Sequence, residues 1–173
     1  KNRNLNNYIG FDVNKNLVST AKHKCGDKKV KLTNDIYTEI KNSNANIYVS
    51  FFVLEHLHDP KLFWDIMRTK PKGTLFYFSV PVLSFSTLLD SLFDSFAARS
   101  IDNFLHTQLY SDESLNYIFK KSGYKVVSQW LFGQDSNDFF RLLNNKREKN
   151  FVIKELIEKS KIMLDEFQSI IDK

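Results

Sequence analysis

Short apolar runs and helical stripes alternate along the chain. Residues 8–13 form a short apolar run rich in strand-forming residues, and residues 30–35 alternate apolar and polar side chains like a strand near a sheet edge. Residues 47–53 and 74–80 are apolar almost without break, which is typical of parallel strands covered on both faces. Strands separated by helical segments in this order predict right-handed crossovers and a parallel sheet.

Residues that typically begin and end helices lie between these predicted strands. Asn14 is placed to cap a helix with apolar residues at near-helical spacing, and Gly26 ends that helix. Residues 62–67 carry an apolar stripe that predicts a second helix. Ser111, followed at once by two acidic residues, starts a further helix that ends at Gly123.

The pattern changes in the second half of the chain. Residues 88–96 form an amphipathic helical stripe, which predicts a helical insertion over about residues 83–110. Residues 124–132 are interpreted as a final strand. From residue 148 to residue 173 apolar positions recur at alternating spacings of four and three, as in a short coiled-coil seam. We therefore predict an α/β domain over residues 1–147 and a C-terminal helix over residues 148–173.

Composition and charge narrow the class of protein. The 173 residues are 42% hydrophobic and 26% charged, which predicts a soluble globular domain. No apolar run approaches the roughly 20 residues that span a bilayer, so we expect no membrane partner. The start does not resemble a signal peptide, and the single cysteine, Cys25, favours a cytoplasmic location. The net charge of +5 comes from scattered lysines, so nucleic acid is a disfavoured partner.

Two segments carry a family resemblance. Residues 49–60 (VSFFVLEHLHDP) and residues 70–81 (KPKGTLFYFSVP) resemble the back half of a class I S-adenosylmethionine-dependent methyltransferase domain. The resemblance covers roughly residues 8–132. It implies a Rossmann-like, doubly wound and mostly parallel sheet with helices on both faces. It also implies S-adenosylmethionine as the cofactor.

The chain departs from this family in its glycines. Methyltransferases of this class begin with a strand and a glycine-rich turn, broadly DxGxGxG, that approaches the amino-acid portion of the cofactor. The chain has five glycines, and no two of them are close in sequence. We therefore expect the N-terminal strand and helix of the family fold to be missing, and weak or absent binding of S-adenosylmethionine by these residues.

The resemblance places the cofactor at the ends of the strands. Asp12 corresponds to an acidic residue that accepts hydrogen bonds from ribose hydroxyls, and a carboxylate suits this because it offers two acceptor oxygens. Asp35 corresponds to an acidic residue near the adenine. Each aspartate could instead cap a following helix or turn, and both alternatives stay open. The resemblance assigns the cofactor site to Asp12, Val13, Asp35, Ile36, Phe51 and Phe52.

Three residues are candidates for catalysis. Glu55 and His56 follow a predicted central strand at its carboxyl end, where open α/β sheets bind ligands. They could act as acid and base, orient a substrate, or have a structural hydrogen-bonding role. His106 precedes a helix start in a segment that covers the active site in related methyltransferases, and it could deprotonate an acceptor near neutral pH. We expect no metal site, because His56 and His58 with the nearby Asp59 lack a defined ligand set.

These observations lead to one functional prediction with two alternatives. The chain is predicted to be a fragment of a methyltransferase that transfers a methyl group to a small-molecule or sugar acceptor. The helical insertion and residues 132–135 (FGQD) are similar to enzymes that serve surface polysaccharide biosynthesis. One alternative is a non-catalytic methyltransferase-like scaffold that forms a homodimer through its C-terminal helix. The other is a nucleic-acid-modifying enzyme, which only the net positive charge favours.

Overall fold

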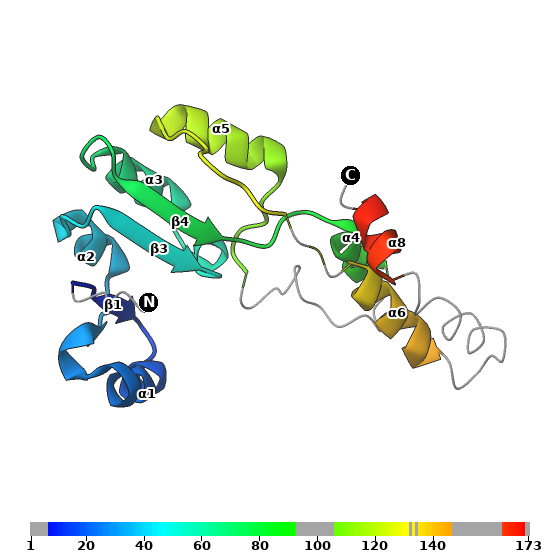
Figure 1. Ribbon diagram of the computed structural model, residues 1–173, viewed down its shortest axis with the longest axis horizontal. Coiled ribbons are helices and arrows are strands. Elements are labelled where there is room, and N and C mark those ends of the chain that lie inside the picture. The colour runs from blue at the N-terminus through cyan, green and yellow to red at the C-terminus, as the bar shows by residue number, and fades with distance from the viewer. Residues whose placement is uncertain (1–6, 93–105, 132, 134, 147–163, 172–173) are drawn as a thin grey trace, which may run out of the picture. The chain divides into compact units, whose positions relative to one another are not determined.

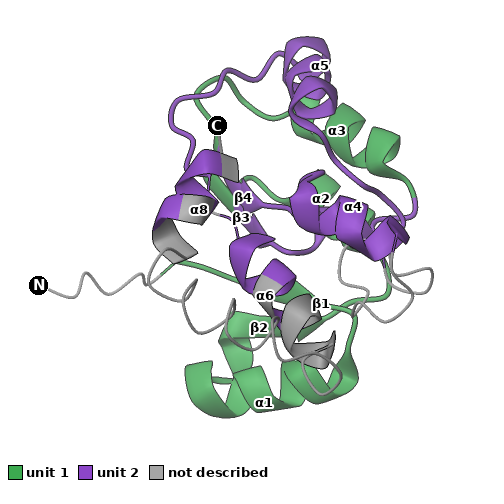
Figure 2. Cartoon of the chain, turned by 90° about the vertical axis from the view of Figure 1, so that its right-hand side faces the viewer, with its two compact units in different colours: residues 1–48, 59–75 green, residues 49–58, 76–173 purple. Residues whose placement is uncertain are grey.

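The computed structural model describes residues 7–92, 106–131, 133, 135–146 and 164–171. The chain divides into two compact units (Figure 2), which are residues 1–48 with 59–75 and residues 49–58 with 76–173. Helices and short parallel strands alternate along it, which confirms the predicted α/β class (Figure 1). In chain order the elements are β1 (Gly10–Asp12), α1 (Lys15–Cys25), η1 (Asp27–Lys29), β2 (Val30–Leu32), α2 (Ile36–Asn42), β3 (Ile47–Phe51), η2 (Leu54–His56), α3 (Pro60–Arg68), β4 (Leu75–Ser79), α4 (Phe85–Leu92), α5 (Asp112–Ser122), α6 (Asp135–Lys146) and α8 (Leu164–Ile171).

The first unit begins with β1, α1 and β2. The strands β1 and β2 pair in parallel, with Asp12 opposite Leu32 at their carboxyl ends. The Asn14 side chain accepts hydrogen bonds from two backbone N–H groups at the start of α1, so it is the N-cap that the sequence predicted. Gly26 follows the helix with a φ of 95°, a conformation that residues with a Cβ atom rarely adopt. Val18 is the buried residue of α1.

In the same unit, α2 packs against α3. Helix α3 buries the predicted apolar stripe and begins at Pro60, and the Asp59 carboxylate accepts the Leu62 N–H at 2.8 Å. Lys70 reaches the end of α2, where its ammonium group donates to the carbonyl oxygens of residues 40, 41 and 43. A cation at this place satisfies carbonyl groups that have no partner within the helix. The buried residues of α3 are Phe63, Trp64, Ile66 and Met67.

The strands β3 and β4 form a second two-stranded sheet, and both arrows point the same way in Figure 1. The prediction that residues 47–53 are covered on both faces is wrong. Ile47, Val49 and Phe51 are each more than half exposed, whereas Tyr48 and Ser50 are half-buried. Successive side chains of a strand point to opposite faces, so the described part of the chain covers one face of β3 and not the other.

The predicted strand over residues 124–132 is also wrong. Residues 124–131 form no strand, and Val127 and Trp130 are 85% and 83% exposed. A strand requires a neighbouring strand with which its backbone N–H and C=O groups can pair, and neither of the two sheets in the described part of the chain includes this segment. Residue 132 lies outside the described residues.

The second unit contains α4, α6 and α8, with Phe85 and Phe139 packed on the buried Leu89. Helix α4 falls within the predicted insertion, and residues 93–105 of that insertion lie outside the described residues. Helix α8 falls within the predicted C-terminal helix and packs against α6. Residues 148–163 of that prediction are likewise outside the described part. None of the described helices is long and apolar enough to cross a membrane.

A buried aspartate joins three helices of this unit. Asp135, at the start of α6, is 4% exposed and accepts hydrogen bonds from the Ser86 N–H at 2.6 Å and the Gln168 side chain at 3.3 Å. Burial raises the pKa of its carboxyl group, but hydrogen bonds from Ser86, Ser84 and Gln168 outweigh burial and leave the pKa lowered. One carboxylate therefore links the three helices α4, α6 and α8.

Replacing Asp135 with alanine is expected to lower the free energy of unfolding by about 1–3 kcal/mol, because the buried Ser86 N–H loses its acceptor. Urea unfolding followed by circular dichroism measures the change. Asn137→Ala, at an exposed position of the same helix, is the matched control and should change stability by less than about 0.5 kcal/mol. Equal losses in the two variants would contradict this account.

Candidate functional site

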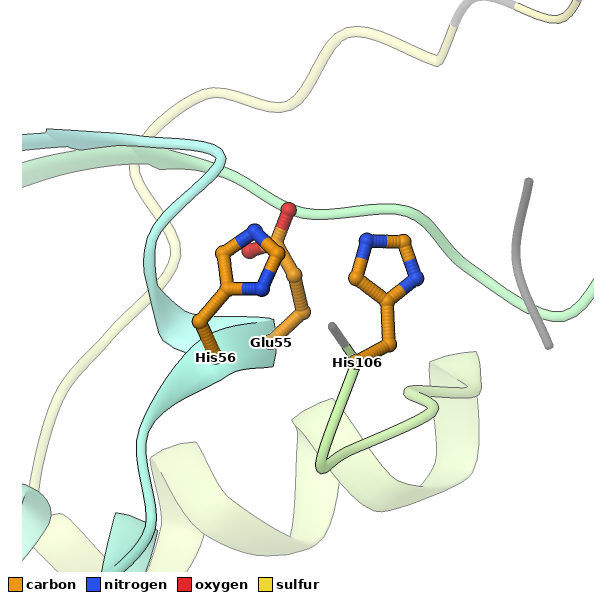
Figure 3. A group of neighbouring side chains, drawn as sticks. All are labelled: Glu55, His56 and His106. Carbon is orange, nitrogen blue, oxygen red and sulfur yellow. The ribbon is translucent and has the colours of Figure 1, made fainter. Parts of the chain in front are cut away.

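Glu55, His56 and His106 come together in the second unit (Figure 3). Glu55 and His56 lie on η2, the short 3-10 turn that follows β3, and His106 lies about fifty residues later, before α5. Glu55 is 1% exposed, His106 is half-buried and His56 is exposed. The cluster therefore has a buried carboxylate at one side and imidazole rings that reach solvent. The structure thus joins the three residues that the sequence proposed for catalysis.

Backbone hydrogen bonds fasten the segment after His106 to η2. The N–H groups of Thr107 and Gln108 both donate to the Glu55 carbonyl oxygen, at 2.8 and 3.1 Å. The Thr107 hydroxyl donates to the Leu57 carbonyl oxygen at 2.8 Å. These bonds hold His106 beside Glu55 and His56 although the two segments are far apart in sequence.

The side chains of the cluster are close enough to act on one ligand. The rings of His56 and His106 lie 4.9 Å apart between centroids and are tilted by 48°. One ligand atom from each residue lies within 4.8 Å of the others, and Figure 3 shows the three side chains pointing to the same side. The Glu55 Oε2 atom is buried and has no hydrogen-bond partner among the described residues. Burying a carboxylate oxygen without a hydrogen-bond partner costs free energy.

Tyr110 lies next to this cluster and is 4% exposed. Its hydroxyl donates to the Leu54 carbonyl oxygen at 3.3 Å, and its backbone pairs with Val82. Burial, and then the negative charge of Glu55, raise the pKa of Tyr110 from 10.0 to about 12. The hydroxyl is therefore neutral and donates its hydrogen bond at physiological pH.

The raised pKa of Tyr110 predicts a loss of stability in base. The folded state holds the phenol proton more tightly than the unfolded state, so this contribution is complete below pH 10 and is lost as the pH rises toward 12. We expect wild type to lose more stability than Tyr110→Phe over this interval in urea unfolding. Parallel losses in the two proteins would contradict it, and Tyr117→Phe, at an exposed position, serves as the control.

The backbone before the cluster is strained. Phe52 has a φ of 54°, in the left-handed region that disfavours bulky side chains, and its N–H donates to the Ser79 carbonyl oxygen at 3.0 Å. Strain of this kind costs on the order of 1–3 kcal/mol and collects at functional sites. Phe51 and Phe52 are 61% and 53% exposed. The assignment of Phe51 and Phe52 to the cofactor site stays a prediction. The strained backbone at Phe52 sets the direction in which the chain enters η2.

The other predicted cofactor residues lie in the first unit. Asp12 ends β1 and is half-buried, and its Oδ1 atom accepts the Asn14 N–H at 2.7 Å. An open groove of about 430 Å³ runs beside it, lined by residues of β1, α1 and β2 that include Gly10 and Leu17. Val13, the next residue, is 66% exposed. Asp12, the last residue of β1, thus borders a groove that runs along the whole of β1 and one side of α1.

Asp35 follows β2 and caps α2. Its carboxylate accepts hydrogen bonds from the backbone N–H and the hydroxyl of Thr38, and its own N–H donates to the Thr33 hydroxyl at 3.1 Å. The Thr38 hydrogen bonds lower the pKa of Asp35. The Thr33 N–H donates to the Asp12 carbonyl oxygen at 3.0 Å, so Asp12 and Asp35 belong to neighbouring strand ends. Ile36 is the first residue of α2.

The sequence identified His106 as a candidate site residue but did not predict that it lies beside Glu55 and His56. Sequence reasoning weighed His56 with its neighbours His58 and Asp59, but His58 is exposed and the Asp59 side chain caps α3. No local pattern signals that His106 returns to η2. Its position before the helix start at Ser111 was the signal that identified it as a site residue.

Comparison with known proteins identifies the family of this chain. Residues 2–129 match the family model described as a methyltransferase domain. No curated protein and no solved structure gives a match. The matched segment spans most of the chain, contains every predicted site residue, and confirms the resemblance carried by residues 49–60 and 70–81. The chain therefore belongs to the methyltransferase domain family.

Proposed function

We propose that this methyltransferase domain uses S-adenosylmethionine to methylate a small-molecule or sugar acceptor. The observation that carries the proposal is the cluster of Glu55, His56 and His106, which lies directly after β3 in a chain of this family. Ligands of open α/β sheets bind at the carboxyl ends of the strands, and this cluster is in that position.

The strand ends of the first unit suit the nucleoside part of the cofactor. Asp12 and Asp35 are carboxylates on adjacent strand ends, and each has acceptor capacity beyond the hydrogen bonds it makes. Ribose hydroxyls and an adenine amine are donors, so they match these oxygens. We propose that Asp12 binds the ribose and that Asp35 and Ile36 border the adenine.

The cluster in the second unit suits the acceptor. S-adenosylmethionine supplies an electrophilic methyl group, and its transfer to a hydroxyl yields S-adenosylhomocysteine and one proton. The carboxylate of Glu55 and the imidazoles of His56 and His106 are groups that orient a hydroxyl and ease the loss of its proton. Positioning the acceptor oxygen supplies much of the remaining rate enhancement.

The proposed acceptor class is a small polyol or a sugar, including one destined for a surface polysaccharide. A hydroxyl-rich acceptor offers several oxygens, and the cluster presents three polar side chains on one side (Figure 3). Helix α4 follows β4 and lies within the predicted helical insertion. That insertion is one of the two features in which the sequence resembles enzymes of surface polysaccharide biosynthesis.

The test is formation of S-adenosylhomocysteine by the purified chain with a panel of nucleotide sugars, free sugars and small phenols. S-adenosylmethionine is supplied at millimolar concentration, because a chain with five scattered glycines is expected to bind it weakly. Acceptor-dependent product supports the proposal, and Asp12→Asn should raise the cofactor concentration needed for half-maximal rate. Calorimetry measures cofactor binding separately. Absence of acceptor-dependent product at millimolar S-adenosylmethionine and saturating acceptor would refute the proposal.

A non-catalytic scaffold that dimerises through the C-terminal helix is the competing function. The described part of this helix, α8, packs on α6 of the same chain, and its Gln168 side chain bonds Asp135 and Ser136. These contacts occupy Gln168 within the chain and do not favour the scaffold. Light scattering of a chain lacking residues 148–173 tests it, because the scaffold requires that a dimer be lost.

A further inference from the structure

We propose that Glu55, His56 and His106 bind one divalent transition-metal ion. The donor set is one carboxylate and two imidazoles, which suits Zn²⁺, Fe²⁺, Co²⁺ or Mn²⁺ better than Mg²⁺, an ion that prefers oxygen ligands alone. Three protein ligands leave coordination positions open for a further molecule, as in catalytic rather than structural metal sites.

The distances between the three ligand atoms are compatible with a metal site whose ligands move slightly inward when the ion binds. The ligand atoms lie within 4.8 Å of one another. Ligands bound at about 2.1 Å lie roughly 3–3.5 Å apart in a tetrahedral site, so binding requires shifts of about 1 Å. His56 is exposed and His106 is half-buried, so side-chain rotation supplies these shifts without disturbing the core.

The buried carboxylate is the second observation that points to an ion. Glu55 is 1% exposed, and its Oε2 atom has no hydrogen-bond partner among the described residues. A metal ion would pair this oxygen and offset the cost of its burial. The backbone hydrogen bonds from Thr107 and Gln108 to Glu55 fix the spacing of the ligands before an ion arrives.

The ion also has a task in the proposed function, and this part of the inference rests on that function. A divalent ion bound to an acceptor hydroxyl would lower its pKa, so the oxygen would lose its proton to solvent water. The oxygen would then attack the methyl group, and the sulfonium would leave as the neutral thioether of S-adenosylhomocysteine. The histidines then act as ligands and not as proton acceptors. A sugar with neighbouring hydroxyls would fill two open positions at once.

The test is titration of the full chain with Co²⁺ alone, followed by visible absorption, in the absence of cofactor and acceptor. We expect one ion per chain, and a loss of affinity of about 10-fold or more in His56→Asn, His106→Asn and Glu55→Gln. His58→Asn, two residues from His56 and outside the cluster, is the matched control and should bind like wild type. A large excess of Mg²⁺ should not displace Co²⁺, whereas Zn²⁺ should.

Three results would overturn the metal site. They are no Co²⁺ binding by the folded chain, binding that survives all three cluster substitutions, and an equal loss in His58→Asn. Circular dichroism verifies folding, and the substitutions at the two more accessible histidines decide the matter if Glu55→Gln unfolds. The proposed function stands or fails separately, because it is decided by S-adenosylhomocysteine formation and this site by ion binding alone.

Discussion

Replacing His106 with asparagine is expected to lower the rate of methyl transfer by about 10²-fold or more, the range typical of losing a group that activates a nucleophile. The loss should fall on kcat, with little change in the affinity for S-adenosylmethionine, because Asp12 and Asp35, the residues proposed to contact the ribose and the adenine, lie in the first unit. His106 is half-buried, and the backbone bonds of Thr107 and Gln108 that hold its segment do not involve its side chain. The fold should therefore survive the substitution.

The measurement is S-adenosylhomocysteine formation at saturating acceptor, with cofactor binding measured by calorimetry. His58→Asn is the control, since His58 is exposed, lies in the same segment as His56, and is outside the cluster. If His106→Asn kept the full rate, the cluster would not be the acceptor site. If it lost cofactor affinity and kept kcat, the residue would belong to the cofactor site instead.

Replacing Leu54 with alanine should lower the free energy of unfolding by about 2–5 kcal/mol. Leu54 is 1% exposed and is among the largest fully buried side chains, so its truncation removes apolar contacts and leaves a cavity. The melting temperature should fall by roughly 5–15 °C for a chain of this size. Because Leu54 precedes Glu55 on η2, the same change should loosen the cluster.

Thermal unfolding followed by circular dichroism measures this loss. Leu83→Ala is the matched control, because Leu83 is the same residue type in the same unit and is 53% exposed. It should cost less than about 1 kcal/mol. A similar loss in both variants would contradict the expectation that burial of the Leu54 side chain stabilises the fold.

The sequence anticipated the local elements well. Asn14 and Gly26 bound α1, and Ser111 and Gly123 bound α5, as predicted. Ser111 and Ser114 form a capping box, in which each side chain accepts a hydrogen bond from the backbone N–H of the other residue. Caps and glycines act on backbone groups only a few residues away, so a short stretch of sequence is enough to predict where a helix begins and ends.

Two local expectations failed for a shared reason. Residues 124–131 have strand-forming composition but no strand, and β3 is apolar yet exposed on one face. Strand pairing and face coverage depend on residues distant in the chain. Composition indicates that a segment suits a buried sheet, but it cannot specify which neighbour pairs with it or covers it.

The candidate site also has a part that a local motif predicts and a part that depends on residues distant in the chain. From sequence alone, the motif around Glu55 and His56 determined the family and the strand end at which a ligand would bind, because that motif is contiguous. The tertiary structure alone decided that His106, and not the neighbouring His58, completes the cluster. It also decided that Glu55 is buried and that its Oε2 atom has no hydrogen-bond partner in the described part of the chain. Those facts depend on hydrogen bonds from Thr107 and Gln108 to a carbonyl about fifty residues away, which no local spacing encodes.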